Sequence, residues 1–184
     1  YPGEVVVRVN APVAGIYTVT INGISNYTRV GASGYVNIVI RGLNASDNAY
    51  PISVSGDPDD DSYNPMVNNT LRVKVNRAGS SVNVVDVTDG VYDSPVVVNF
   101  NIPVDGNASG ITDDVKIYNA TSGAGIAGLS IVVDNDAKTV TINGLANGDY
   151  IINVTTIPKN SNYHSGVSSG RIHVGQAVMI LPAT

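Results

Sequence analysis

The chain of 184 residues contains no cysteine and no tryptophan, and its aromatic residues are 10 tyrosines and one phenylalanine. Without cysteine it can form neither a disulfide nor a thiolate metal site, which leaves its redox compartment open. Without tryptophan it lacks the usual aromatic platform of a carbohydrate-binding module. The sequence therefore argues against two common kinds of small extracellular module, the disulfide scaffold and the sugar-binding domain.

Basic residues are also scarce, with 10 Lys and Arg against 15 Asp and Glu and a net charge of −5. They are scattered singly, so no basic face can displace the counterions of a nucleic acid. An anionic membrane surface is disfavoured for the same reason. No apolar run approaches the roughly 20 residues needed to cross a bilayer, so we expect no membrane insertion within this chain. Because it begins at Tyr1 without Met or a signal peptide, we expect a mature or excised piece of something longer.

Residues for catalysis or metal binding are few. Glu4 is the only glutamate, which argues against a paired-carboxylate hydrolase in each half of the chain. Two histidines, His164 and His173, do not make a metal centre without further ligands, and no G-x-S-x-G motif marks a nucleophile. We therefore predict that the chain is not an enzyme and holds no cofactor.

What the chain does have is valine and isoleucine in alternation with polar residues. Both side chains pack well on a pleated sheet, and the abundant Gly, Asn, Asp and Ser supply turns. A period of two recurs in every apolar run, whereas a helical period never persists. The sequence predicts an all-β protein.

A long stretch of the sequence occurs twice. Val36–Tyr63 and Lys138–Tyr163 share an alternating strand, a Gly-Leu pair, a turn, a Tyr, a second strand and a closing Tyr. Tyr1–Gly15 also matches Tyr92–Gly106 without a gap. The matched positions are Gly42-Leu43 with Gly144-Leu145, Tyr50 with Tyr150, and Tyr63 with Tyr163. Self-similarity of this extent predicts two tandem domains, residues 1–79 and 80–184.

Turn residues delimit the expected strands of the first domain. Asn22-Gly23 lies between two alternating runs, Ile16–Ile21 and Ile24–Val30, and predicts a type I′ hairpin. Pro51 suggests an edge strand or a bulge. The other strands expected in this domain cover Glu4–Asn10, Tyr35–Ile40, Ala49–Gly56 and Thr70–Asn76.

The two domains differ at their starts and in one loop region. Val82–Val87 predicts a leading strand for domain 2, whereas domain 1 starts at Tyr1 and lacks its counterpart. Domain 2 is also longer, with extra residues at Asn107–Gly110 and in the small-residue loop Ala120–Gly128. A long loop on a rigid sandwich is a common place for function and equally a place where sequence drift is tolerated.

The order of these motifs is a VVV strand ending in Pro, a TVTING hairpin, TVTINGL, GDY, an S-x-Y loop and a final R-V-x-V strand. It resembles the immunoglobulin-like repeat of large prokaryotic surface proteins, particularly the adhesin-like proteins of methanogenic archaea. The resemblance implies two tandem immunoglobulin-like β-sandwich domains at the cell surface, in a non-catalytic structural and adhesive segment. The implied partners are neighbouring domains or subunits of the same surface protein and a host or cell-surface ligand.

Asn-x-Ser/Thr sequons are dense for a chain of this length and are glycan acceptors in an exposed protein. Five are expected in turns or loops and the last one in a strand. The candidate sites are Asn26, Asn44, Asn68, Asn107, Asn119 and Asn153.

An acidic run in domain 1 is a weak candidate for calcium, since Ca²⁺ takes six to eight oxygen ligands. The candidates are Asp57, Asp59, Asp60 and Asp61. The run lacks a regular Asp-x-Asp-x-Asp-Gly spacing, and domain 2 has a near-neutral loop there. A solvated acidic loop is the favoured interpretation.

An apolar tail, AVMILP, follows the last strand of domain 2. Since domain 1 lacks a leading strand, the tail could add to domain 1 of the next subunit and build a head-to-tail filament. This filament subunit is the alternative to a surface segment. The donor candidates are Ala177, Val178, Met179, Ile180, Leu181 and Pro182.

The tyrosines that match between the domains are expected in the core and at corners, with their hydroxyls bonded to backbone. The tyrosines without a match, which are the candidates for a binding surface, are Tyr17, Tyr27, Tyr35 and Tyr118.

Overall fold

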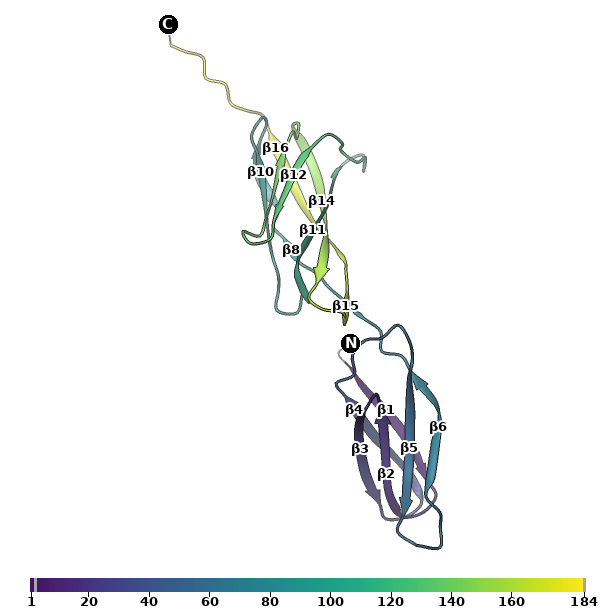
Figure 1. The fold of residues 1–184 in the computed structure, drawn as a ribbon. Coiled ribbons are helices and arrows are strands. Elements are labelled where there is room, and N and C mark those ends of the chain that lie inside the picture. Colours follow the sequence, from purple (N-terminus) through teal and green to yellow (C-terminus); the bar gives the residue numbers. More distant parts are fainter. Residues whose placement is uncertain (2, 184) are drawn as a thin grey trace. The chain divides into compact units, whose positions relative to one another are not determined.

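A computed structural model describes residue 1 and residues 3–183. All elements in this part of the chain are β-strands, and the predicted all-β class is confirmed. The chain divides into two compact units, Tyr1–Ala78 and Gly79–Thr184, each built from sheets in a sandwich-like arrangement (Figure 1). The described residues include no helix long and apolar enough to span a membrane.

Unit 1 has a sheet of two strands and a sheet of four. The two-stranded sheet pairs β1 with β4, and the larger sheet has the order β3-β2-β5-β6. The strands are β1 (Glu4–Ala11), β2 (Gly15–Ile21), β3 (Ile24–Val30), β4 (Gly34–Arg41), β5 (Tyr50–Pro58) and β6 (Met66–Val73).

The predicted hairpin between β2 and β3 is confirmed. Asn22 and Gly23 have φ angles of 48° and 78°, the left-handed pair that a type I′ turn requires. The turn fixes the register, because Ile21 then lies opposite Ile24 and pairing continues to Gly15 and Val30. A two-residue turn leaves β3 no choice of neighbour other than β2.

The core of unit 1 lies between its two sheets. β2 has every second side chain buried, as the alternating sequence requires, and the facing strands β1 and β4 contribute the opposite wall. The fully buried apolar side chains are Val7, Val9, Ala11, Tyr17, Val19, Ile21, Ile38, Ile40, Leu43 and Ile52. Burial of this face is what selects the strand register.

For Pro51 the structure supports the bulge and not the edge strand, and the bounds of the final strand of unit 1 are corrected. β5 lies between β2 and β6, so Pro51 is in a central strand, and the irregularity is a register shift beside it, between the pairs Ile52–Leu71 and Val54–Asn68. The bulge, not an edge, accommodates the proline. The final strand begins at Met66 rather than Thr70 and ends at Val73, because polar Asn68 and Asn69 extend the ladder without showing apolar alternation.

Unit 2 has two four-stranded sheets, in the orders β12-β13-β10-β8 and β11-β14-β16-β9. A short strand at the boundary of the units, β7 (Ala78–Gly79), pairs with β15. The remaining strands are β8 (Asn83–Val84), β9 (Val87–Val91), β10 (Val96–Asn101), β11 (Ala108–Asn119), β12 (Ser130–Asp134), β13 (Thr139–Asn143), β14 (Gly148–Pro158), β15 (Tyr163–His164) and β16 (Val167–Gly175).

The predicted leading strand Val82–Val87 is divided between the two sheets. β8 pairs antiparallel with β10, and after two residues the chain crosses to pair as β9, parallel to β16. Val84 and Val87 are partly buried and pack on the core. Gly170 makes this possible, since a Cβ there would lie 2.5 Å from Cγ1 of Val84. A glycine in β16 thus admits the leading strand.

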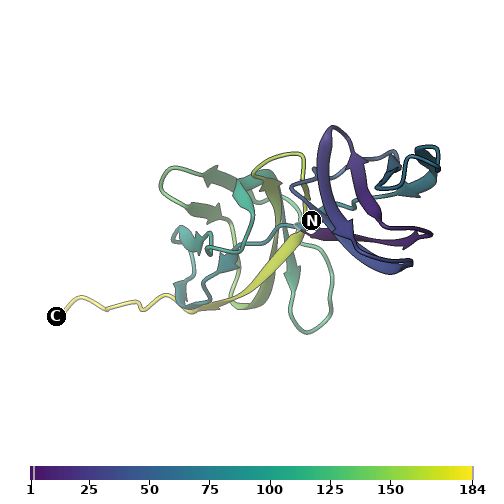
Figure 2. The same cartoon turned by 90° about the horizontal axis from the view of Figure 1, so that it is seen from below.

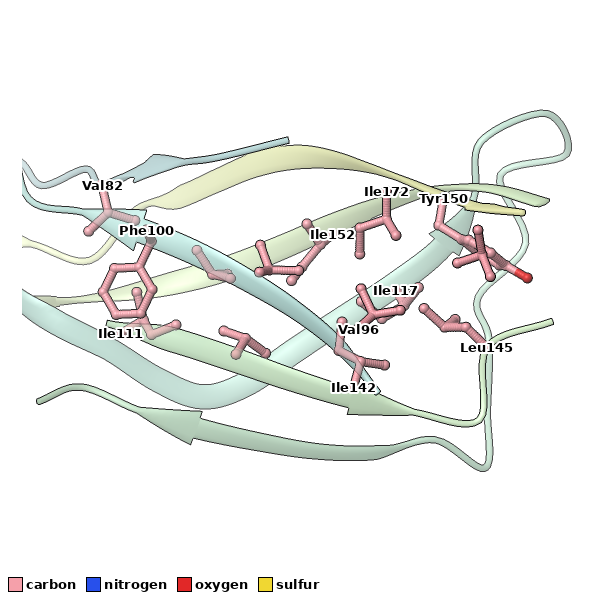
Figure 3. Close-up of a cluster of buried hydrophobic side chains, with 14 of the residues drawn as sticks. Val82, Val96, Phe100, Ile111, Ile117, Ile142, Leu145, Tyr150, Ile152 and Ile172 are labelled. Atoms are coloured by element: carbon pink, nitrogen blue, oxygen red, sulfur yellow. The ribbon is translucent and has the colours of Figure 1, made fainter. Parts of the chain in front are cut away.

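The core of unit 2 runs the length of the sandwich. Figure 3 shows Val82, Phe100 and Ile111 at one end and Ile142, Leu145 and Tyr150 at the other. All of these side chains are buried, with 5% or less of their surface exposed. The extra residues expected at Asn107–Gly110 are mostly strand, because β11 begins at Ala108, and the buried Ala108 belongs to the core.

The two units differ in which sheet receives one strand. In unit 1, β3 joins β2, whereas in unit 2 its counterpart β12 joins β13 in the opposite sheet. The connection explains the difference, because the two-residue turn after β2 has been replaced by the longer Ala120–Gly128 loop after β11. The longer loop lets the chain cross the edge of the sandwich. The short turn therefore accounts for one of the two strands by which the β1–β4 sheet is narrower than its counterpart in unit 2, and the leading strand β8 accounts for the other.

Candidate functional site

Among the described residues, two of the unpaired strand edges in unit 1 belong to β1 and β6. Among the described residues, β1 pairs only with β4, and β6 pairs only with β5. Their counterparts in unit 2 are paired on both sides, β10 with β13 and β8, and β16 with β14 and β9. An open edge presents backbone N–H and C=O groups to an incoming strand. Unit 1 therefore has both edges that the leading strand covers in unit 2.

A cleft of about 310 Å³ lies between these two edges. β1 forms one side through Val7 and Val9, and β6 forms the other through Met66, Val67 and Leu71. Tyr17 and Val54 also line it. Leu71 is 48% exposed and Val67 is 66% exposed, so apolar side chains face solvent here. The walls of the cleft are therefore apolar side chains, and its rims are the backbone groups of β1 and β6.

Sequence reasoning missed this cleft, although one signal pointed to it. Leu71 lies opposite Ile52, as Gly170 lies opposite Ile152 in unit 2. An alignment of the two repeats places a large apolar residue where the other copy has the glycine that admits Val84. This difference between leucine and glycine lies on the strand that is unpaired along one edge in unit 1 and pairs with β9 in unit 2.

The tail beyond β16 is the second apolar surface. It contains no strand among its described residues, and it runs away from the strands of unit 2 in both views (Figures 1 and 2). Val178, Met179, Ile180 and Leu181 are 85–89% exposed. The six predicted donor residues, 177–182, thus expose four large apolar side chains in succession, and their donation to another subunit stays a prediction.

The acidic run forms a turn after β5. Oδ1 of Asp59 is 2.6 Å from Nη1 of Arg29, and Oδ1 of Asp60 accepts a 2.8 Å hydrogen bond from the backbone N–H of Ser62. That bond lowers the pKa of the Asp60 carboxyl group. In the described part of the chain, no three acidic or histidine side chains are placed together as a metal site, and Asp57 and Asp61 are exposed beside the turn. The carboxylates of Asp59 and Asp60 are thus already engaged, the first by Arg29 and the second by the backbone of Ser62.

A second ion pair ties a loop of unit 1 to the end of the unit. The guanidinium of Arg77 hydrogen-bonds Asp47, and this bond, followed by the positive charge itself, lowers the pKa of the Asp47 carboxyl group. The same bond raises the pKa of Arg77. Because both groups lie at the surface, solvent screens the pair and its contribution to stability is small.

The sequons are distributed differently from the expectation. Asn26, Asn68 and Asn119 lie within strands β3, β6 and β11, not in turns or loops. Asn153 lies in β14 as expected, between two buried neighbours, and therefore on the outward face. Only Asn44 and Asn107 are outside strands among the described elements. Asn26 lies in Ile24–Val30, which the Asn22-Gly23 signal itself predicts as a strand, and Asn119 is the last residue of β11, next to a turn. Asn68 is on a polar outward strand face, which resembles a loop in sequence.

Several sequon amides are engaged in hydrogen bonds. Nδ2 of Asn26, the atom that would carry a glycan, donates a 2.9 Å bond to the carbonyl of Val39. Oδ1 of Asn68 instead accepts bonds from the backbone and hydroxyl of Thr70, its own sequon partner. Asn68 is exposed. Its geometry suits modification better than that of Asn26, and glycan occupancy stays a prediction.

The histidines of unit 2 lie in separate places. Nδ1 of His173 is 2.7 Å from Oδ1 of Asp149, at a polar hollow of about 430 Å³ that Arg171 and Asp86 also line. His164 is on β15, where its ring contacts the carbonyl of Ser165. Among the described residues, no hydroxyl group forms a hydrogen bond with the His173 ring. A His–Asp pair alone has no nucleophile to activate.

The tyrosines divide between core and surface. The hydroxyls of Tyr50 and Tyr150 donate to the carbonyls of Asn44 and Ala146, at 3.0 and 2.8 Å, as predicted for matched corner residues. For Tyr63 and Tyr92, which are also matched, the expected place in the core is wrong, because they are 54% and 50% exposed. Tyr17 is buried and donates to Val13, so its expected place on a binding surface is wrong.

Of the other tyrosines without a match, Tyr27 and Tyr35 are 69% and 65% exposed. The Arg8 guanidinium lies 4.0 Å from the centre of the Tyr35 ring. Tyr118 is partly buried. Of the candidate tyrosines, Tyr27 and Tyr35 are therefore the two that are exposed, and both lie on unit 1.

No family model matches the chain. No curated protein matches it either. Among solved structures, it is similar to a Ca²⁺-stabilised adhesin that helps an Antarctic bacterium reach out and bind ice, with 21% identity and a TM-score of 0.37. The similarity covers 97% of this chain and 45% of that one, so the chain spans less than half of the adhesin's length. We draw no functional conclusion from this similarity.

Asp47→Asn should make the melting temperature of the chain less dependent on pH. A carboxyl group with a lowered pKa in the folded state stabilises it above the unfolded pKa, about 4, and this contribution is lost as pH falls through the folded pKa. We expect the variant to melt slightly below the unmodified chain at pH 7 and at the same temperature near pH 3, measured by calorimetry. Asp113→Asn, at an exposed position of β11, is the control. If Asp47→Asn lowers the melting temperature by the same amount at both pH values, the prediction is contradicted.

Proposed function

We propose that the chain is an extracellular structural and adhesive segment of a prokaryotic surface protein, without catalytic activity. The observation that carries this proposal is the repetition of one sandwich-like unit with the same corner in each copy. Leu43 and Leu145 are buried at equivalent places, and the corner tyrosines Tyr50 and Tyr150 bond backbone in the same way. Repetition of a rigid unit lengthens a molecule, which suits a spacer that presents a binding surface.

The two units are proposed to be immunoglobulin-like. In unit 2, β8, β10, β13 and β12 lie in the order that the immunoglobulin fold gives its A, B, E and D strands. β11, β14 and β16 correspond to C, F and G. A tyrosine near the start of the F strand that bonds upstream backbone is a further mark of this fold, and Tyr150 is such a residue. These features support an immunoglobulin-like fold for unit 2.

The adhesive surface is proposed to lie on unit 1, where exposed Tyr27 and Tyr35 present large amphipathic side chains. Tyrosine contributes contact area at a low cost in conformational entropy, which favours it in recognition surfaces. The ligand would be a host or cell-surface molecule. Exposed sequons such as Asn68 would carry glycans on the same protein.

Labelling of intact source cells tests the surface location. Antibodies raised against the folded chain should label unpermeabilised cells as strongly as lysed ones, since the proposal places every unit outside the membrane. A cytoplasmic protein probed in the same samples controls for leakage. Labelling that appears only after lysis would contradict the proposal.

A second candidate function is a subunit of a surface filament, in which residues 177–182 add as a strand to unit 1 of the next subunit. The exposed tail and the two open edges of unit 1 favour it. A heterologous contact of this kind repeats without closing and gives a fibre. Each apolar surface would be a liability alone, and each would cover the other.

Removal of residues 178–184 tests the filament candidate. The unmodified chain should form head-to-tail fibres in negative-stain images at high concentration, because each tail finds an open edge. The shortened chain should stay monomeric with an unchanged melting temperature, since the exposed tail does not contribute to the core. Fibres that persist after the deletion, or an unmodified chain without fibres, would contradict this candidate.

A further inference from the structure

We propose that the polar hollow beside His173 in unit 2 binds a neutral sugar, with Asp86 and Asp149 accepting its hydroxyl protons and the guanidinium of Arg171 donating to its oxygens. The site belongs to a different unit from the aromatic surface proposed above, and it gives a ligand to side chains that the proposed function leaves unused. The ligand class follows from the donors and acceptors that the hollow leaves available and from its charge.

Each carboxylate of the hollow has one oxygen engaged and one oxygen available. Oδ1 of Asp149 is 2.7 Å from Nδ1 of His173, its cross-strand neighbour. Oδ1 of Asp86 accepts a 2.9 Å hydrogen bond from the backbone N–H of Arg171. Among the described residues, Oδ2 of neither aspartate forms a hydrogen bond. Because the engaged oxygens hold the side chains in place, the second oxygens are positioned acceptors.

The guanidinium of Arg171 is the available donor. In the described part of the chain its side chain forms no ion pair, hydrogen bond or ring contact, whereas every other arginine side chain bonds a carboxylate or a carbonyl or lies over a tyrosine ring. These other arginines are Arg8, Arg29, Arg41, Arg72 and Arg77. A guanidinium only donates and a carboxylate only accepts. A ligand that bonds both must itself accept and donate.

The charge of the hollow selects a neutral ligand. Two aspartates and one arginine line it with His173, so the lining carries a net charge of −1 or of zero, according to the charge of that histidine. An anion would need a positive lining, and a cation would leave the guanidinium unpaired. A hydroxyl group has no net charge and both donates and accepts. Several hydroxyls on one neutral ring, as in a hexose, therefore match the hollow.

One wall of the hollow comes from the start of the Ala120–Gly128 loop. The N–H of Ala120 donates a 2.9 Å hydrogen bond to the carbonyl of Asp149, which holds the loop beside β14. The N–H of Thr121 donates a 2.9 Å bond to Oδ1 of Asn119, and Thr121 lines the hollow. The loop expected as a place for function thus supplies part of this site.

The repeat offers an internal comparison. Unit 1 has an arginine, Arg72, at the position that matches Arg171. It has Ala49 in place of Asp149 and Lys74 in place of His173. Unit 1 therefore keeps the donor of the hollow and lacks the carboxylate and the histidine that holds it. The proposed site is particular to unit 2.

The hollow extends past Arg171. A smaller hollow of about 220 Å³ is also lined by Asp86 and Arg171, so the two adjoin and suit two joined sugar rings. Tyr150, the tyrosine that lines the larger hollow, is 5% exposed, so stacking on an aromatic ring contributes little. Hydrogen bonds without stacking leave a dissociation constant on the order of millimolar for a single ring.

Titration of the isotope-labelled full chain with sugars, followed through its amide resonances, tests the ligand class. The probes are glucose, galactose and mannose, each compared with its uronic acid and its amino sugar. At least one neutral hexose should shift the amides of Thr121, Asp149 and His173 in a saturable way, and its charged relatives should bind about threefold weaker or more. Tighter binding of a uronic acid or an amino sugar would overturn the proposal. So would saturable shifts only outside the hollow, or none.

Matched variants test the two kinds of group. Arg171→Met and Asp149→Asn should each raise the dissociation constant of the neutral sugar about fivefold or more, because a donor or an acceptor is lost. Arg72→Met, at the matched position of unit 1, is the control and should change it less than about twofold. Unchanged amide resonances away from the hollow establish that each variant is folded. Equal binding by the Arg171→Met and Arg72→Met variants would overturn the site, and neither result bears on the surface location.

Discussion

Pairing of strand edges is the constraint on which this structure depends. A backbone N–H or C=O group at the rim of a sheet must bond another strand or water, and an apolar core beside that rim must be covered. Unit 2 satisfies both demands with one segment, because β8 and β9 close one edge of each sheet while Val84 and Val87 cover the core. Unit 1 has the same two edges without the segment, so the cleft and its exposed Leu71 follow directly.

Connection length accounts for the other difference between the units. The Asn22-Gly23 turn holds β3 beside β2, whereas the Ala120–Gly128 loop releases β12 to the opposite sheet. β10 and β13 thus belong to a four-stranded sheet, but β1 and β4 form a sheet of two. Two nearly identical core patterns therefore give sheets of different width.

Much of this architecture could be predicted from the sequence, and the failures have physical reasons. Alternation with a period of two indicated the strands and their buried faces, and Asn22-Gly23 indicated the hairpin, because both signals are local. Which edge a strand pairs with is not local, so the widths of the sheets and the cleft beside Leu71 could not be read from periodicity. Asn68 was predicted outside a strand because an outward strand face is polar like a loop. The burial of Tyr17 depends on space left by Gly56 in the neighbouring strand, a tertiary contact.

Hydrogen–deuterium exchange of the dilute chain tests the central claim, that unit 1 is open along β1 and β6. Peptides covering β1 should exchange faster than peptides covering β10, its paired counterpart, because β1 has a neighbour on one side only among the described strands. Equal protection of β1 and β10 in the dilute monomer would contradict the account.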